Sequence, residues 1–129
     1  MPGGGTQGPA ATKSARQAAE ILRFVNFFAV QGNMDSTEVK RMLPRKRILE
    51  ISGYRVGLIH GWGSPNGIEE RISRELPGAN VIIYGHSHIP ASHSRDGIFF
   101  FNPGTATGYS FDRYHSVGIL ELGDKISGE

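Results

Sequence analysis

The chain has 129 residues, a formal net charge of +2 and 38% hydrophobic residues, which suits one domain with a real core. A cysteine count of 0 excludes disulfide scaffolds, cysteine-type zinc fingers and thiol catalysis, and it is compatible with the cytoplasmic location that we expect. No apolar stretch approaches the ~20 residues that span a bilayer, and the first residues do not have the pattern of a secretory signal. We therefore expect no membrane partner.

The basic residues form one cluster, between Arg41 and Arg47, which holds four cationic side chains. A solvated turn explains such a cluster more simply than a phosphate-binding patch. Because the net charge is small, a nucleic-acid partner is not expected, although binding through this cluster stays open as the least supported alternative.

The first third of the chain predicts a lead-in, two helices and a strand. Residues 1–12 are rich in Gly and Pro and are predicted to be disordered, so the domain is expected to cover residues 13–129. Helical spacing of apolar residues predicts a helix from Ser14 to about Asn26, followed by a buried strand over residues 27–30. A second helix is expected over residues 37–43, capped by Ser36 or Asp35 and stopped by Pro44.

The rest of the chain alternates between hairpins and single elements. Strands are predicted over residues 47–51 and 54–59 around Ser52-Gly53, and over 91–95 and 98–101 around Asp96-Gly97. Between these hairpins we expect an amphipathic helix over residues 66–75 and an apolar strand over 81–84. A final strand is predicted over residues 116–122. This mixture indicates an α/β fold with a mixed parallel and antiparallel sheet.

Four apolar runs stop at a glycine that adjoins a polar residue able to bind a ligand. The four segments are Gly32-Asn33, His60-Gly61, Gly85-His86-Ser87-His88 and Asn102-Pro103-Gly104. Ligands bind at the carboxyl ends of the strands of an α/β sheet, where glycine lets the backbone turn sharply.

The pair His86 and His88 is the sharpest of these signals, but two histidines alone are as readily structural residues as metal ligands. His60 and Asn33 at the ends of other strands favour a metal site, although Asn33 by itself is more simply a turn residue. His93 and His115 have no comparable context and are predicted to be surface residues.

These four segments, in this order and spacing over about residues 18–122, resemble the C-terminal part of the calcineurin-like metallophosphoesterases, most closely the small bacterial and archaeal phosphodiesterases. The resemblance implies a mixed-sheet α/β/β/α sandwich and hydrolysis of phosphodiesters or phosphomonoesters at a dinuclear metal site. It implies that Asn33, His60 and His86 are ligands of one metal and His88 of the other. Asp35 stands where the family has an acidic residue that supports the site.

The sequence departs from that family at its beginning. The family opens with an Asp-x-His strand and a second strand that ends in Gly-Asp, but here no Asp precedes Asp35 and no His precedes His60. The first β-α-β unit is therefore expected to be missing, which makes residues 13–129 a partial calcineurin-like phosphoesterase domain. Met34 also replaces the histidine that acts as general acid in many relatives, so no catalytic residue can be assigned.

The remaining ligands are neutral, and this determines what we expect of the site. One Asn and three His supply no negative charge to offset the repulsion between two adjacent cations. Imidazole suits zinc or nickel better than manganese, which favours oxygen ligands, although the resemblance implies manganese, zinc, nickel or iron. We expect weak metal binding and impaired turnover. The alternative is a non-catalytic scaffold or interaction protein of the same fold, as the resemblance of a retromer subunit to these enzymes shows.

The expected partner is a phosphoester substrate, whose identity the sequence does not give. Trp62 and Tyr109 are candidates to border its pocket, although packing explains such aromatic residues more often. Absence of the first strands is expected to leave the strand at residues 27–30 as an exposed apolar edge. This predicts either a homo-oligomer or a longer natural chain of which this sequence is a fragment.

Overall fold

The computed structural model describes residues 28–32, 35–106 and 115–129, in two compact units, Met1–Arg45 and Lys46–Glu129. The predicted lead-in over residues 1–12 and the predicted helix over 14–26 lie outside the described residues. The boundary expected between residues 12 and 13 therefore stays a prediction.

In the first unit, helix α2 (Thr37–Met42) confirms the second predicted helix to within one residue. The hydroxyl oxygen of Ser36 accepts a hydrogen bond from the N–H of Val39 at 3.3 Å, so Ser36 is the N-cap rather than Asp35. The N–H of Leu43 donates to the carbonyl of Val39, and the chain leaves the helix before Pro44.

The strand predicted over residues 27–30 is wrong in its described part, because residues 28–30 are not in a strand. Phe28 is 43% exposed. An apolar run becomes a strand only where a neighbouring strand pairs with its backbone, and this requirement is invisible in the run itself. The homo-oligomer was predicted from an exposed strand edge at this segment, and without the strand that prediction has no basis in this segment.

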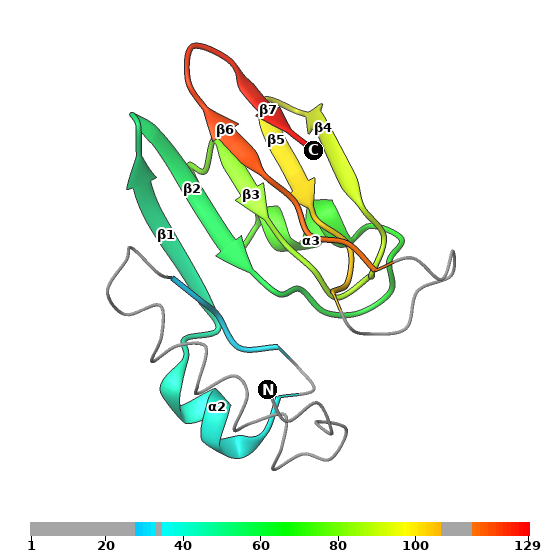
Figure 1. Ribbon diagram of the computed structural model, residues 1–129. Helices are drawn as coiled ribbons and strands as arrows, with labels where there is room; N and C mark the ends of the chain where they lie inside the picture. The colour runs from blue at the N-terminus through cyan, green and yellow to red at the C-terminus, as the bar shows by residue number, and fades with distance from the viewer. Residues whose placement is uncertain (1–27, 33–34, 107–114) are drawn as a thin grey trace. The chain divides into compact units, whose positions relative to one another are not determined.

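The second unit is built on a five-stranded sheet in the order β1-β2-β3-β5-β4 (Figure 1). Its strands are β1 (Lys46–Ile51), β2 (Tyr54–Ile59), β3 (Val81–Ile83), β4 (Ala91–Arg95) and β5 (Ile98–Asn102). The three central strands β2, β3 and β5 run parallel, and β1 and β4 pair antiparallel at the two sides. The predicted mixed sheet is confirmed, and both predicted hairpins are present.

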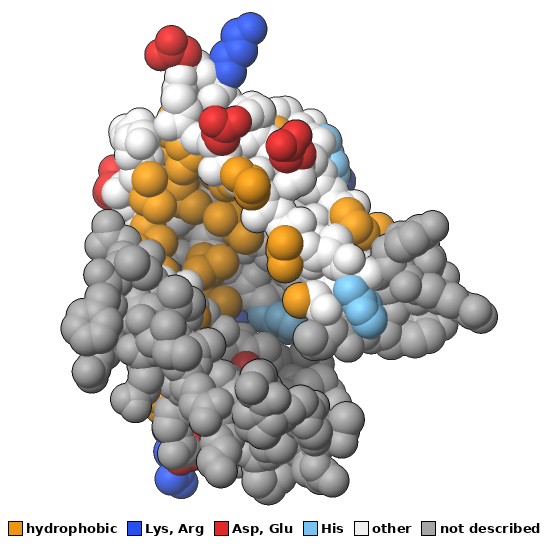
Figure 2. All heavy atoms as spheres, viewed as in Figure 1, with side chains coloured by type: hydrophobic (Ala, Val, Ile, Leu, Met, Phe, Trp, Pro, Cys, Tyr) orange, Lys and Arg blue, Asp and Glu red, His pale blue; other side chains and the backbone are white. Residues whose placement is uncertain are grey.

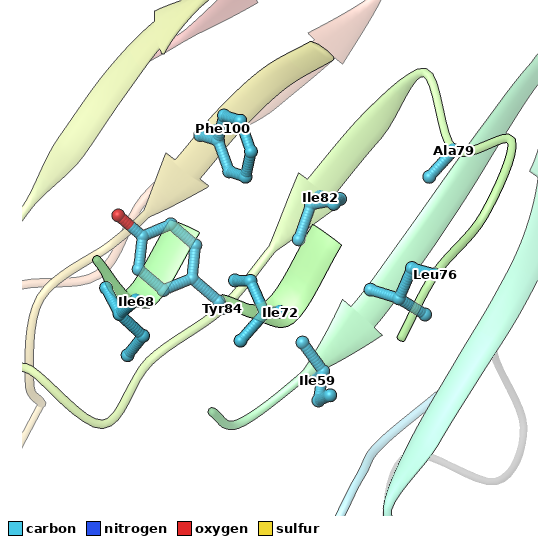
Figure 3. Close-up of a cluster of buried hydrophobic side chains, with 8 residues drawn as sticks. All are labelled: Ile59, Ile68, Ile72, Leu76, Ala79, Ile82, Tyr84 and Phe100. Carbon is cyan, nitrogen blue, oxygen red and sulfur yellow. The ribbon is translucent and has the colours of Figure 1, made fainter. Parts of the chain in front are cut away.

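One face of the sheet packs against helix α3 (Ile68–Ser73), which is shorter than the predicted helix over residues 66–75. Figure 3 shows the side chains of this helix and its following turn directed at those of the sheet. The buried cluster is Ile59, Ile68, Ile72, Leu76, Ala79, Ile82, Tyr84 and Phe100. Full burial of an aliphatic or aromatic side chain contributes about 1.5–3 kcal/mol, so this cluster holds the strands at fixed positions.

The other face carries the two-stranded sheet of β6 (Leu120–Leu122) and β7 (Ile126–Gly128), as Figure 1 shows. A Cβ atom at Gly118 or Gly128 would lie 2.5 Å from the ring of Phe101, so glycine allows this close approach. The predicted final strand over residues 116–122 is correct only in its last three residues, and β7 was not predicted. Strand β6 forms only where β7 pairs with it.

Hydrophobic side chains gather on the face of the molecule drawn in Figure 2. Among the described residues, Val117 and Ile119, which lead into β6, are 80% and 66% exposed. In the part of the chain that the structure describes, no helix is long and apolar enough to cross a membrane.

Candidate metal and phosphoester site

Three of the four predicted ligand segments meet at one end of the sheet. Because β2, β3 and β5 are neighbours and parallel, their carboxyl ends lie along the same edge. His60 follows β2, the loop of residues 84–90 follows β3, and Asn102 ends β5. Figure 2, drawn from the same side as Figure 1, shows histidine side chains at this end of the sheet. The topology thus brings side chains far apart in sequence to one place.

His60 and His86 form the centre of this edge. Their ring centroids are 5.4 Å apart and the ring planes meet at 77°. The N–H of Gly85 donates to the carbonyl of His60 at 3.0 Å, which joins the two strand ends. A Cβ atom at Gly85 would lie 3.5 Å from Nδ1 of His60, at ordinary van der Waals distance, so Gly85 lies directly beside the imidazole.

The imidazole of His86 is oriented by the backbone of the loop after β2. Its Nε2 lies 2.9 Å from the carbonyl oxygen of Gly63. A carbonyl oxygen only accepts, so Nε2 carries the hydrogen of this bond and Nδ1 of the neutral ring keeps its lone pair. Metal-binding histidines commonly donate their second ring N–H to a backbone carbonyl in this way. His86 therefore fits the role of a ligand through Nδ1.

The loop that carries His86 has a conformation that its sequence does not favour. His86 and His88 have φ angles of +68° and +62°, in the left-handed region where a side chain costs about 1–2 kcal/mol per residue. Such conformations persist only when the surrounding structure holds them, and they cluster at functional sites.

Asn102 is one of the groups that hold this loop. It is 1% exposed, and its Nδ2 donates to the hydroxyl of Ser87 at 3.1 Å, while its Oδ1 accepts from the N–H of Gly104 at 2.9 Å. The hydroxyl of Ser87 also accepts from the N–H of Ile89 at 3.2 Å. Asn102 thereby connects the end of β5 to the middle of the histidine loop. Sequence analysis noted the Asn-Pro-Gly segment but assigned no role to Asn102.

The loop after β2 is held by Arg71 of α3. Its guanidinium donates to the carbonyl of Trp62 at 2.6 and 3.0 Å and to that of Ser64 at 2.6 Å. The guanidinium carbon also lies 5.8 Å from the centroid of the Trp62 ring, which is partly buried against the core. Packing therefore accounts for Trp62, and Tyr109 lies outside the described residues.

The remaining predicted site residues are placed as follows. His88 is in the same loop as His86, but no three His, Cys, Asp or Glu side chains of the described residues are close enough together to hold one ion. Asn33 lies outside the described residues. Asp35, in the first unit, accepts the N–H of Gly32 at 2.6 Å. His93 and His115 are exposed, as predicted.

A buried polar cluster beside the loop was not predicted. Glu69 of α3 is 7% exposed, and its carboxylate accepts from the hydroxyl of Tyr84 at 2.5 Å and lies 2.8 Å from Nε2 of His93. Burial and the neighbouring carboxylate raise the pKa of Tyr84 well above its ordinary value. The cluster lines a cavity of about 440 Å³, together with Ser87 and Arg95. A Glu next to apolar residues of a helix gives no signal in the sequence that it is buried.

A mixed α/β sheet with imidazoles at the carboxyl ends of its parallel strands defines a class of protein that binds its ligand at this edge. Comparison with known proteins identifies the class. The family model of the calcineurin-like phosphoesterase superfamily domain matches residues 7–125. The chain belongs to this superfamily, and the match confirms the resemblance found in the sequence.

Two curated relatives with similar sequences are described as a metallophosphoesterase and a phosphodiesterase. The chain is 42% identical over 104 residues to a probable metallophosphoesterase of Methanothermobacter thermautotrophicus, which covers 78% of this chain and 59% of the relative. It is 35% identical over 127 residues to the phosphodiesterase YfcE of Escherichia coli, with 89% of this chain and 62% of the relative covered. The chain thus spans less than two thirds of the length of these relatives.

Solved structures have the same fold. A Thermotoga maritima protein determined by solution NMR matches with a TM-score of 0.66 and 30% identity, over 91% of this chain and 71% of that one. A Vps29 of Entamoeba histolytica, complexed with Zn²⁺ in its crystal, matches with a TM-score of 0.63 and 25% identity, over 88% of this chain and 74% of that one.

Proposed function

We propose that this chain is a phosphoesterase domain whose metal site lies at the carboxyl edge of β2, β3 and β5. The observation that supports it is the His60–His86 pair, whose rings come from two neighbouring strand ends and lie 5.4 Å apart. His60, His86 and Asn33 are proposed as ligands of one ion and His88 of a second, with Asp35 as a supporting residue.

The residues fit a borderline cation. Imidazole nitrogen is a good ligand for zinc and nickel, and a poor one for manganese, which favours oxygen. The unprotonated Nδ1 of His86 is available because Nε2 is held by the carbonyl of Gly63. A divalent ion bound here supplies Lewis-acid chemistry toward a phosphoryl oxygen. The protein's own contribution is to orient the imidazoles and to fix the two loops that surround the substrate.

We further propose that the 129-residue chain by itself binds metal weakly and turns over little substrate. The four proposed ligands bring no negative charge, so two adjacent cations would repel each other without a bridging carboxylate. A second chain that supplied Asp and His side chains would complete the site. The cytoplasm is the proposed compartment, since a chain without cysteine has no need of an oxidising environment.

The test is hydrolysis of bis(p-nitrophenyl) phosphate and p-nitrophenyl phosphate by the pure chain with Mn²⁺, Zn²⁺ or Ni²⁺. We expect slow turnover that is lost in the H60A/H86A double variant. Robust turnover by the wild-type chain would contradict the proposed impairment, and turnover unchanged in the double variant would contradict the site. Complete inactivity without metal binding would favour the second candidate, a non-catalytic interaction protein, which the exposed Val117 and Ile119 also support.

A further inference from the structure

One buried carboxylate contacts the chain on both sides of His86 and His88. Tyr84, the first residue of the 84–90 loop, donates its hydroxyl hydrogen to Oε2 of Glu69 at 2.5 Å. His93, on the strand that follows the loop, lies with Nε2 2.8 Å from Oε1 of the same carboxylate. Glu69 itself is part of α3, so the helix holds the chain before and after the loop.

The carboxylate is buried, and its surroundings balance its charge. The side chain of Glu69 is 8% exposed, and Nη1 of Arg95 lies 3.7 Å from Oε1. A buried carboxylate is costly unless its oxygens are hydrogen-bonded and its charge is compensated. Here each oxygen has a different partner, so the same group can restrain two segments at once.

The loop requires such restraint because its own sequence does not favour its conformation. His86 and His88 adopt positive φ angles without being glycine. Asn102 holds the loop through the hydroxyl of Ser87 and the carbonyl of Gly85, and the N–H groups of Tyr84 and Gly85 donate to the carbonyls of Phe101 and His60. Glu69 adds the side-chain contacts that join α3 to the chain on both sides of the loop, at Tyr84 and His93.

We infer that Glu69 is a positioning residue for the metal site: it clamps the two ends of the 84–90 loop and so sets the direction of the His86 and His88 imidazoles. This inference rests on the proposed metal site. It assigns Glu69 no contact with metal or substrate, and it makes the buried cluster a functional part of the site rather than a part of the core alone.

The experiment compares E69A, E69Q and Y84F in the full chain, with E70Q as the matched control. Glu70 is the neighbouring carboxylate, but it is exposed and pairs with Arg74 on the surface of α3. The first readout needs no metal: amide hydrogen exchange of residues 85–89 and the imidazole ¹⁵N shifts of His86 and His88. The second is the affinity for Co²⁺ and the absorption spectrum of the Co²⁺ complex.

In E69A we expect the rate of amide hydrogen exchange to rise at least about tenfold more in the loop than in the β1–β2 hairpin. We expect the affinity for Co²⁺ to fall about 10–100-fold, which is the range seen when a group that orients a metal ligand is removed. Glutamine can accept from Tyr84 and donate to the neutral ring of His93, so E69Q should restore both readouts to within about threefold of wild type. Y84F removes only the hydrogen bond from Tyr84 to Glu69, so loop exchange and Co²⁺ affinity should change in the same direction but less than in E69A. It also serves as the test if E69A does not fold.

Equal loosening of the loop and of the β1–β2 hairpin would overturn the inference, since Glu69 would then only stabilise the fold. Loop exchange and imidazole shifts that stay at wild-type values in folded E69A or Y84F would also overturn it. If the wild-type chain binds no Co²⁺, the proposed metal site fails, while the exchange data still decide whether Glu69 clamps the loop.

Discussion

The two ends of the parallel strands are built in different ways. At the amino end, the chain turns through Ser52-Gly53 before β2 and through Asp96-Gly97 before β5. All four residues have positive φ angles, and nothing lies within 4 Å of a Cβ atom placed on either glycine. At the carboxyl end, longer loops place His86 and His88 in the same left-handed region, and hydrogen bonds to Gly63 and from Asn102 hold the loop between them.

The two ends differ in what causes their positive φ angles: the turn itself at the amino end, and contacts from other elements at the carboxyl end. In the hairpins, two consecutive positive φ angles are what a tight two-residue turn requires, and the residues Ser-Gly and Asp-Gly suit it. In the histidine loop the N–H of Ser87 donates to the carbonyl of Gly85 at 2.8 Å across His86, as in a γ-turn, which is a rare and strained turn that contacts from other elements must hold. The carboxyl end is therefore the part of the sheet where contacts from other elements hold the backbone conformation.

The largest expected effect comes from removing the buried amide at the carboxyl end. N102A leaves the N–H of Gly104 and the hydroxyl of Ser87 without their partner, so the free energy of unfolding should fall by about 1–3 kcal/mol. The control is N80A at the amino end, where Oδ1 of the exposed Asn80 accepts the N–H of Arg55 at 2.7 Å. Water can replace this bond, so N80A should cost less. Equal losses in urea titrations would show that the two ends do not differ.

A smaller change in stability is expected when glycine replaces Ser52 in the β1–β2 turn or His88 in the histidine loop. Glycine relieves a positive φ angle, at the cost of greater freedom in the unfolded chain, so S52G and H88G should each change stability by at most about 1 kcal/mol. The two variants should differ in metal affinity, which H88G lowers and S52G leaves unchanged. Thermal unfolding and Co²⁺ titration measure both quantities. An unchanged affinity in H88G would remove His88 from the proposed ligands.

The smallest effect is spectroscopic. The raised pKa of Tyr84 means that its hydroxyl stays protonated in the folded chain at pH values where an exposed tyrosine ionises. The unfolded chain ionises near the ordinary value of 10, so the contribution of Tyr84 to stability is complete below that pH and is lost as the pH rises above it. Absorbance at 295 nm should show one of the four tyrosines ionising last, and this step should vanish in Y84F. A Tyr84 that ionises with the others would mean that water reaches its hydroxyl.

Local sequence rules recovered the amino end of the sheet and left the carboxyl end incomplete. Ser52-Gly53 and Asp96-Gly97 predicted both hairpins. The glycines beside His60 and His86 indicated the edge at which we propose the metal site. Glu69 and Asn102 were not assigned because burial of a polar residue depends on elements that meet only after folding. For the same reason β7 was missed and residues 28–30 were wrongly predicted as a strand.

The measurement that most directly tests the central claim is isothermal titration of Zn²⁺ and Co²⁺ into the wild-type chain and the H60A, H86A and H93Q variants. His93 is the control because its ring meets Glu69, and glutamine can keep that contact. We predict weak saturable binding that H93Q leaves within about threefold of wild type and that H60A and H86A each reduce by more than about tenfold. Binding that does not change in H60A and H86A, or that falls equally in all three variants, would contradict a metal site at the His60–His86 pair.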